Sequence, residues 1–363
     1  MKIMQNRLDR GFQMYQKEFE DKALEVLRSG WYILGNEVQQ FEKEFADYVS
    51  SEYCVGLASG LDALVLAFRA LGIKSGDEVI VQANTYIASV MGISMNGATP
   101  VFVEPNEYYN IDYDKIEEKI TSKTKAILVV HLYGQATNME KILEICSKHN
   151  LYLVEDCAQS HGAKFNGKMT GTFGDIGCFS FYPSKNLGAF GDAGVITTNS
   201  KDIAENIKIL RNYGSEKRYH NKVVGFNSRL DEIQAGLLRV KLKHLDDLLE
   251  ERVHIAERYY TEISNPKIML PQVNNNCTAV WHLYVLRVED RDNFTKYLND
   301  NGIGNLVHYP IPPHLSDAYE YLGFDKGSFP LTEEYAEKVI SIPIFNGMND
   351  EEVDYVVDII NKY

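Results

Sequence analysis

Between about residues 53 and 198, short runs of β-branched and aromatic residues alternate with segments of helical periodicity. The runs predict strands at Tyr53–Leu57, Glu78–Gln82, Pro100–Glu104, Ala126–Leu132 and Leu151–Asp156. The segments between them predict helices at Leu61–Leu71, Tyr86–Asn96, Tyr113–Ile120 and Asn138–His149. Repeated strand–helix–strand units favour a mostly parallel α/β sheet with helices on both faces. Two further predicted strands, Cys178–Tyr182 and Gly194–Thr198, have no helix between them, so we expect a mixed sheet.

The segments on either side of this region predict further helices and a small second domain. An N-terminal helix is predicted to end at Gly30, with its apolar residues near one face: Phe12, Tyr15, Phe19, Ala23, Val26 and Leu27. Arg229–Tyr260 suits one helix or a pair of helices, and Asn265–Thr278 reads as a loop. A strand at Trp281–Val288 and a helix at Arg291–Asn301 then begin a small α+β domain. We therefore expect residues 1–35 to pack with the small domain, 36–245 to form the large domain, and 246–363 to form the small one.

Charge and cysteine content exclude several classes of protein. The 363 residues include 37 basic and 51 acidic side chains, a formal charge of −14, which opposes binding to nucleic acid or anionic lipid. The five cysteines are scattered, without zinc-site spacing, so we expect no metal: Cys54, Cys146, Cys157, Cys178 and Cys277. The first residues lack an apolar signal segment, and no apolar run is long enough to cross a membrane. We expect a cytoplasmic protein.

The common nucleotide-binding and hydrolase motifs are absent. No GxGxxG follows a strand, and the chain has no GxxxxGK[ST], GxSxG or HExxH. The absence of these motifs argues against a dehydrogenase, a P-loop kinase, an α/β-hydrolase or a zincin.

Polar residues follow three of the predicted strands. Ser59 and Gly60 open a helix, where backbone N–H groups bind phosphate, although Ser59 by itself also reads as an N-cap. Asp156 ends an apolar strand and needs a cationic or hydrogen-bonding partner there. Ligands of open α/β sheets bind at the carboxyl ends of strands, which is where these residues lie.

Lys185 follows the strand predicted at Cys178–Tyr182, among apolar and small residues. Such surroundings lower a lysine pKa and favour the neutral amine that Schiff-base chemistry requires. A lysine in a glycine-rich loop can equally be a solvated surface group. Together, a phosphate cradle, a strand-end acid and a loop lysine match the three anchors of pyridoxal 5′-phosphate (PLP): phosphate, ring nitrogen and aldehyde.

The order and spacing of these residues resemble those of the DegT-type sugar-nucleotide aminotransferases. The matching stretches include GLASGLDALVLAFRALGIKSGDEVIVQANTYIAS (56–89), HLYGQ (131–135), VEDCAQSHGA (154–163), GDIGCFSFYPSKNLGAFGDAGVITT (174–198) and GFNSRLDEIQA (225–235). The resemblance implies the aspartate aminotransferase fold (fold type I), PLP as cofactor, and a homodimer with shared active sites.

The resemblance also implies a role for each matching residue. Lys185 resembles the catalytic lysine that bonds to the cofactor, and Asp156 the acid that keeps the pyridine nitrogen protonated. Gln159 matches the side chain beside the phenolic oxygen, and Tyr86 the aromatic residue that stacks on the ring. The phosphate contacts would be Ser59, Gly60, Ser180 and, from the other subunit, Asn227.

The C-terminal region narrows the expected substrate. The stretch GIGNLVHYPIPPHL (302–315) resembles members that aminate C3 of a nucleotide-linked 6-deoxy sugar, and we expect dTDP as the nucleotide and glutamate as the amino donor. His308, Tyr309 and Tyr182 are the expected sugar contacts, although a packed, proline-stiffened loop is a serious alternative for His308 and Tyr309. The competing hypotheses are a C4 aminotransferase acting on a 4-keto sugar, another PLP reaction, and a non-catalytic binding protein on the same fold.

Overall fold

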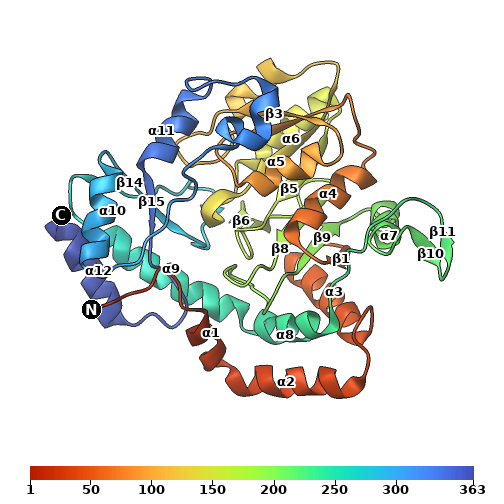
Figure 1. Ribbon diagram of the computed structural model, residues 1–363, viewed down its shortest axis with the longest axis horizontal. Coiled ribbons are helices and arrows are strands. Elements are labelled where there is room, and N and C mark those ends of the chain that lie inside the picture. The colour runs from red at the N-terminus through yellow and green to blue at the C-terminus, as the bar shows by residue number, and fades with distance from the viewer.

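The computed structural model describes all 363 residues and has a seven-stranded sheet at its centre, in the order β1-β9-β8-β5-β4-β2-β3 (Figure 1). The strands are β1 (Tyr53–Leu57), β2 (Glu78–Gln82), β3 (Thr99–Val103), β4 (Thr124–Val130), β5 (Tyr152–Asp156), β8 (Ile176–Ser180) and β9 (Gly194–Thr198). Only β9 runs antiparallel to its neighbours, so the prediction of a mixed sheet is confirmed. Because β1 and β8 are both antiparallel to β9, the carboxyl ends of β1, β5 and β8 lie at the same edge.

Both faces of the sheet are buried, as predicted. Along β4, Ala126, Leu128 and Val130 pack in one apolar cluster with α4 (Gly60–Ala70) and α5 (Ile87–Ser94). The alternate residues Ile127 and Val129 pack in another cluster with α6 (Met139–His149). Alternate residues of β4 thus contact the helices on opposite faces of the sheet, which explains why the strand is apolar throughout.

The helix predicted at Tyr113–Ile120 is wrong. The chain instead forms two short 3₁₀ turns, η1 (Tyr113–Lys115) and η2 (Glu117–Lys119). Only Ile116 is fully buried within this charged stretch, so no apolar stripe is available to hold a longer helix against the sheet. Another helix, α7 (Lys201–Leu210), forms where none was predicted.

The N-terminal segment is broken into two helices, not the single helix predicted. These are α1 (Leu8–Met14) and α2 (Gln16–Ser29), interrupted at Tyr15, and Gly30 ends α2 with a φ of 69°. Helix α2 packs along α8 (Glu232–Lys243) through Phe19, and Figure 1 shows the two helices side by side. Ile3 instead packs in the C-terminal apolar cluster, so the segment contacts both parts of the chain. The division into residues 1–35, 36–245 and 246–363 stays a prediction.

The long helical stretch is a pair of helices, α8 and α9 (Leu245–Glu262), as one of the two sequence readings had it. Beyond them β12 (Ile268–Met269), β14 (Tyr284–Val288) and β15 (Val339–Ile342) form a three-stranded sheet. It is accompanied by α10 (Arg291–Asp300), α11 (Pro330–Lys338) and α12 (Asp350–Lys362). The stretch predicted as a loop at Asn265–Thr278 thus carries β12 and another two-residue strand, β13 (Cys277–Thr278).

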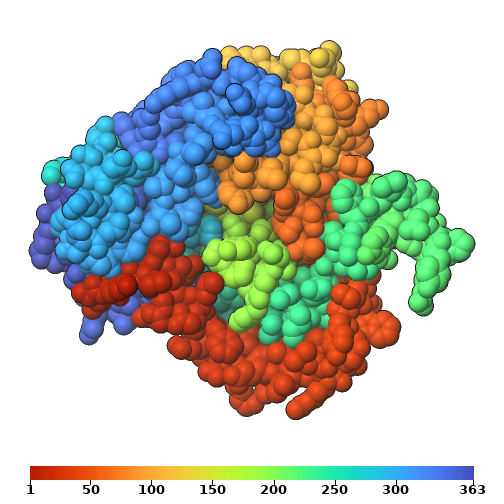
Figure 2. All heavy atoms as spheres, viewed as in Figure 1, coloured from red at the N-terminus to blue at the C-terminus, as the bar shows by residue number.

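The remaining elements are short, apart from α3 (Asn36–Val49), which packs on α8 and β1. They are η3 (Leu132–Gly134), β6 (Lys164–Phe165), β7 (Lys168–Met169), η4 (Pro313–Leu315) and η5 (Asp317–Leu322). A hairpin of β10 (Ser215–Lys217) and β11 (His220–Asn221) projects from the body of the molecule (Figure 2), and Tyr219 at its turn is 84% exposed. No helix combines the length and apolar character that crossing a bilayer requires.

A buried carboxylate fixes β8 against β5. Side chains alternate along a strand, so Glu155 points to the face opposite Asp156. Its two oxygens accept hydrogen bonds from the backbone N–H groups of Gly171 (2.8 Å), Phe173 (2.8 Å) and Gly174 (2.9 Å), just before β8. His131 Nε2 lies 3.0 Å from Oε2, while its Nδ1 accepts from the backbone of Thr137. Assigned this way, Nε2 carries the proton that it donates to Glu155.

The same two residues, with Cys157, are close enough together to suggest a metal site. However, both oxygens of Glu155 and both ring nitrogens of His131 already have partners within the fold. The cluster is therefore explained as a hydrogen-bonded support for the turn before β8.

We expect Glu155→Gln to lower the free energy of unfolding by about 2–3 kcal/mol, because the amide NH₂ group would face backbone N–H donors that then lose their acceptor. Urea denaturation with an unchanged m-value checks this. The exposed Glu52 makes no side-chain hydrogen bond, so Glu52→Gln is the matched control and should stay within about 0.5 kcal/mol of the parent. Equal stability of the two variants would contradict the role given to Glu155.

Candidate active site

In the first part of the site, the end of β8 and the start of β9 pack closely against the N-terminus of α4. Ser59 is the N-cap of α4, and its Oγ accepts the N–H of Asp62 at 3.1 Å. A Cβ on Gly60 would lie 2.4 Å from the Cβ of Ser180, and one on Gly194 would lie 2.4 Å from the carbonyl of Ser59. Only glycine fits at these two positions. The structure thus brings Ser59, Gly60 and Ser180 together at a helix N-terminus, where backbone N–H groups can bind an anion.

Asp156 lies at the carboxyl end of β5 and is only 5% exposed. Its Oδ2 accepts from the hydroxyl of Ser89 at 2.7 Å, and its Oδ1 accepts from the backbone N–H of Ala158 at 3.0 Å. Burial raises the pKa of Asp156, and the hydrogen bonds from Ser89 and Ala158 and the charge of Lys185 oppose that rise. No ion pair neutralises the carboxylate, which is therefore suited to receive a cationic N–H group.

Lys185 lies in the loop after β8 and is half-buried. Its Nζ makes no hydrogen bond and no ion pair, although its backbone N–H donates to Tyr182. Burial lowers the pKa of Lys185 to about 8, while the charge of Asp156 acts in the opposite direction. A substantial fraction of this amine is therefore neutral near physiological pH and can act as a nucleophile or base.

Sequence reasoning missed two residues that contact the predicted site residues, and one of them, Tyr133, connects the site to the C-terminal region. Gln159 accepts the backbone N–H of Tyr133 (2.7 Å) and donates from Nε2 to the hydroxyl of Tyr309 (3.0 Å). The hydroxyl of Tyr133 in turn donates to the backbone carbonyl of His308. Tyr133 lies in the stretch HLYGQ, which matches the family without implying a role for this residue. Ser89 is the second omission, and its only signal is a polar residue on the buried side of an apolar helix.

Among the side chains predicted to stack on the ring or to bind the sugar, Tyr86 and Tyr309 lie close together, whereas Tyr182 lies apart. Tyr86 is 53% exposed, with its ring centroid 5.1 Å from that of Tyr309. His308 Nδ1 lies 2.7 Å from the hydroxyl of Ser341, and burial together with the charge of Lys185 lowers its pKa to about 4. His308 is therefore neutral at physiological pH. Burial raises the pKa of Tyr309, so its hydroxyl stays protonated.

Tyr182 is not part of a strand, contrary to the predicted strand Cys178–Tyr182. Strand β8 ends at Ser180, since the following Pro183 has no N–H to donate to a neighbouring strand. Tyr182 is 55% exposed, and no hydrogen bond or ring contact joins it to His308 or Tyr309. Its side chain is free to meet a ligand from the open side.

Asn227 lies before α8 and is exposed, with no hydrogen bond from its side chain. The next residue, Ser228, accepts the N–H of Ala58 at 3.2 Å and donates to Asp62 at 2.8 Å. The backbone at Asn227 therefore passes close to the start of α4 of its own chain.

These residues fit PLP as the bound group. The N-terminus of α4 offers N–H groups for a phosphate, Asp156 offers a buried carboxylate without a cation, and Lys185 offers an unpartnered amine. The imidazole of His161 is also buried near Lys185 with neither nitrogen hydrogen-bonded, and burial lowers its pKa to about 3. The sequence alone implies no role for His161.

The comparisons with known proteins agree with this site. The model of the DegT/DnrJ/EryC1/StrS aminotransferase family matches residues 13–361. The chain is 55% identical over 350 residues to a dTDP-3-amino-3,6-dideoxy-alpha-D-galactopyranose transaminase of Aneurinibacillus thermoaerophilus, covering 96% of each chain.

Two solved structures resemble the whole fold. DesV of S. venezuelae superposes with a TM-score of 0.98 at 42% identity, covering 99% of this chain and 98% of its own. NtdA of Bacillus subtilis, solved with bound cofactor PMP, gives a TM-score of 0.91 at 31% identity, covering 99% of this chain and 84% of its own. The predicted fold class and cofactor are confirmed. The chain belongs to the DegT/DnrJ/EryC1/StrS aminotransferase family and is a PLP-dependent aminotransferase.

Proposed function

We propose that the protein transfers an amino group from glutamate to the C3 keto group of a nucleotide-linked 6-deoxy sugar, carried on dTDP, in amino-sugar biosynthesis for a surface glycan such as lipopolysaccharide. The observation that carries the chemistry is the pair of groups without an ion-pair partner, buried Asp156 and half-buried Lys185, at one sheet edge. The choice of C3 and of dTDP is supported by the relative at 55% identity, whose name specifies a dTDP-linked 3-amino sugar.

Lys185 and Asp156 are the proposed catalytic residues. Bound PLP supplies an aldehyde and an electron-withdrawing ring. Lys185 Nζ, with a pKa lowered to about 8, is suited to bond to the cofactor and then to carry a proton between donor and acceptor carbons. Asp156 would hold a proton on the ring nitrogen through its buried carboxylate, which Ser89 and Ala158 orient.

The remaining cofactor contacts follow from their places around this pair. Ser59, Gly60 and Ser180 offer the phosphate cradle at the start of α4. Tyr86 would stack on the ring, and Gln159 would lie beside its phenolic oxygen. The hydrogen bond from Gln159 to Tyr309 supports this placement, because it fixes the amide at the end of β5.

His308, Tyr309 and Tyr182 are proposed to bind the sugar. The neutral imidazole of His308 and the protonated hydroxyl of Tyr309 can donate and accept hydrogen bonds to hydroxyl groups without attracting anions. The sugar hydroxyls that neighbour the keto group need such partners. The exposed Tyr182 approaches from the loop that carries Lys185.

We further propose a homodimer in the reducing cytoplasm. Asn227 would contact the cofactor phosphate of the partner subunit; its exposure, and the absence of a hydrogen bond from its side chain within its own chain, support this role. The projecting β10–β11 hairpin offers an arm for a second copy to hold. The five cysteines are all free thiols, which agrees with a reducing compartment.

Asp156→Asn should lower the transamination rate by about 10²-fold or more, equivalent to about 2.8 kcal/mol of barrier, because the amide keeps the shape but loses the charge that holds the ring nitrogen protonated. Stopped-flow absorbance of the cofactor after mixing with glutamate measures it. The exposed Asp47 of α3 gives the control Asp47→Asn, for which the parent rate is expected. A parent-like rate for Asp156→Asn contradicts the proposed cofactor geometry.

Mixing Lys185→Ala with Asn227→Ala chains should restore activity to about a quarter of the parent, since random exchange makes half the dimers hybrid and each hybrid has one intact site. Each variant alone should be nearly inactive. The assay is transamination before and after subunit exchange, with exchange demonstrated by native mass spectrometry. No recovery in exchanged dimers would mean that Asn227 acts within its own subunit. The neighbouring Ser228 already contacts Ala58 and Asp62 of that subunit.

A direct competition between 3-keto and 4-keto 6-deoxy sugar nucleotides tests the proposed function. We expect faster amination of the 3-keto sugar, and His308→Ala should lower kcat/KM for that sugar while hardly changing the half-reaction with glutamate. Product analysis by mass spectrometry gives the ratio. Faster amination of the 4-keto compound makes the protein a C4 aminotransferase, and no amination of either favours a binding protein.

A further inference from the structure

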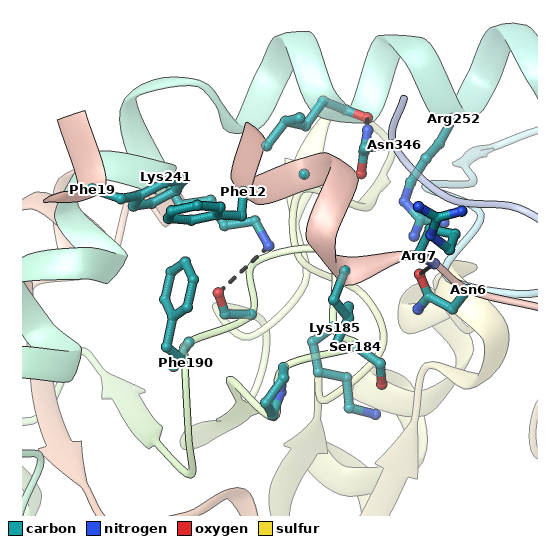
Figure 3. A pocket seen from close by; sticks show the side chains of 16 residues that line it. Asn6, Arg7, Phe12, Phe19, Ser184, Lys185, Phe190, Lys241, Arg252 and Asn346 are labelled. Carbon is teal, nitrogen blue, oxygen red and sulfur yellow. Dashed lines mark hydrogen bonds between the residues drawn. The ribbon is translucent and has the colours of Figure 1, made fainter. Parts of the chain in front are cut away.

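The amine of Lys185 has no hydrogen-bond partner in the protein, although the side chain is half-buried. Figure 3 shows this amine pointing away from Lys241 and from Phe190, so its neighbours lie on the other side of the loop. A lysine that bonds to the cofactor of a transaminase must leave it while the cofactor carries the amino group, and must return afterwards. Its released ammonium group then needs hydrogen-bond acceptors inside the protein.

Three histidines lie close enough to Lys185 that its charge helps to lower the pKa of each: His161, His282 and His308. Burial is the larger cause in every case. The pKa falls to about 3 for His161 and to about 4 for His308, and that of His282 falls well below its usual value. All three imidazoles are therefore neutral at physiological pH, and each has one ring nitrogen with a lone pair that can accept a hydrogen bond.

His161 is 1% exposed and packs at the base of the lysine loop. Its ring centroid lies 5.5 Å from that of Phe181, whose carbonyl accepts the N–H of Ala189 and so closes the loop. Neither ring nitrogen makes a hydrogen bond of ordinary geometry, although the carbonyl of Ser180 is near enough to oppose the fall in pKa. The nitrogen that faces this carbonyl would carry the proton, which leaves the other nitrogen as an unused, buried acceptor.

His282 reaches the same region from the segment before β14, and it too is buried. Asn186, the residue after Lys185, donates to the carbonyl of Val280 at 2.9 Å, which ties this segment to the lysine loop. Nδ1 of His282 is buried without a hydrogen-bond partner, and His161 is close enough to contribute to its lowered pKa. Two imidazoles with unused nitrogens thus lie near one amine that lacks an acceptor.

The other polar groups around Lys185 offer no comparable acceptor. The oxygens of Asp156 already accept from Ser89 and Ala158, and the proposed function reserves this carboxylate for the ring nitrogen. His308 is held through Nδ1, 2.7 Å from the hydroxyl of Ser341, and is proposed to bind the sugar. A cavity on the opposite side of the lysine loop is lined by no acidic residue, and its other charged side chains are all cations: Arg7, Lys241 and Arg252.

We propose that His161 and His282 are positioning residues that accept hydrogen bonds from the Lys185 ammonium group, directly or through one ordered water, whenever the lysine is not bonded to the cofactor. The inference rests on the proposed function, in which Lys185 leaves the cofactor and returns to it. A carboxylate in their place would keep the lysine protonated, whereas a neutral imidazole holds the ammonium group and still lets it lose its proton. The buried nitrogens then have a partner in this state of the enzyme.

Holoenzyme loaded with pyridoxamine 5′-phosphate tests the inference, because that form of the cofactor has no aldehyde and leaves Lys185 free without any substrate. The pH dependence of Lys185 acetylation by acetic anhydride, read by peptide mass spectrometry, gives the pKa of the lysine. We expect His161→Phe to lower that pKa by about one unit, because the charged amine loses an acceptor. The new ring would lie among Phe179 and Phe181, which suits an apolar side chain.

The companion variants separate a lost acceptor from a general disturbance. His161→Gln keeps a hydrogen-bond acceptor and should restore most of the lost pKa, while His282→Phe should lower the pKa as His161→Phe does. His254 is exposed on α9 and makes no side-chain hydrogen bond, so His254→Phe is the control and should leave the pKa of Lys185 unchanged. Circular dichroism checks that each variant is folded.

A crystal structure of the parent with bound pyridoxamine 5′-phosphate needs no variant. It should place Lys185 Nζ within about 3.2 Å of a ring nitrogen of His161 or His282, or of one water bonded to that nitrogen. An amine bonded only to other groups, or an unchanged pKa in folded His161→Phe and His282→Phe, overturns the inference. Amination of the 3-keto sugar by the parent in those cases leaves the proposed function standing. If the histidines hold the lysine but neither glutamate nor the sugar reacts, the proposed function fails while the inference holds.

Discussion

A buried acid, Asp156, and a half-buried amine, Lys185, lie at the same edge of one sheet, and the order of the strands places them there. Burial raises the pKa of Asp156 and lowers that of Lys185, so each group is pushed towards its neutral form. The arrangement depends on β5 and β8 running in parallel, which Glu155 secures through the turn before β8. The protein gives neither group an ion-pair partner, and it thereby reserves both for a bound molecule.

The sugar side of the site is attached to the cofactor side by direct hydrogen bonds. Gln159 bonds to the hydroxyl of Tyr309, and Tyr133 bonds to the backbone of His308. These contacts join residues about 150 or more positions apart in sequence, across the boundary that we expected between two domains. The two regions also share an apolar cluster, since Leu283 and Val339 pack with the sheet residues. The loop that is proposed to hold the sugar is thus fixed by the same elements that hold the cofactor.

The strands and the reactive pair could be predicted from sequence because their signals are local. A strand buried on both faces is apolar throughout, and Asp156 and Lys185 stand out at the ends of such runs. The prediction of a helix at Tyr113–Ile120 was wrong, because Ile116 is the only fully buried residue in this charged stretch. The contacts of Ser89 and Tyr133 could not be foreseen, because each depends on segments that meet only in the folded chain. The roles of Asn227 and of the sugar-binding residues stay predictions.

The single antiparallel strand has a consequence for how the sequence can vary. Gly194 begins β9 against the carbonyl of Ser59, and Gly177 in β8 lies equally close to Gly171, where a Cβ would come within 2.5 Å of its Cα. Even alanine at either position would force backbone apart from backbone, with no flexible side chain to yield. Mutational scanning of the chain should therefore find these two glycines among the least replaceable positions, although neither carries a functional group. Their intolerance of substitution would reflect the close approach of neighbouring backbone segments, and only indirectly a role in the reaction.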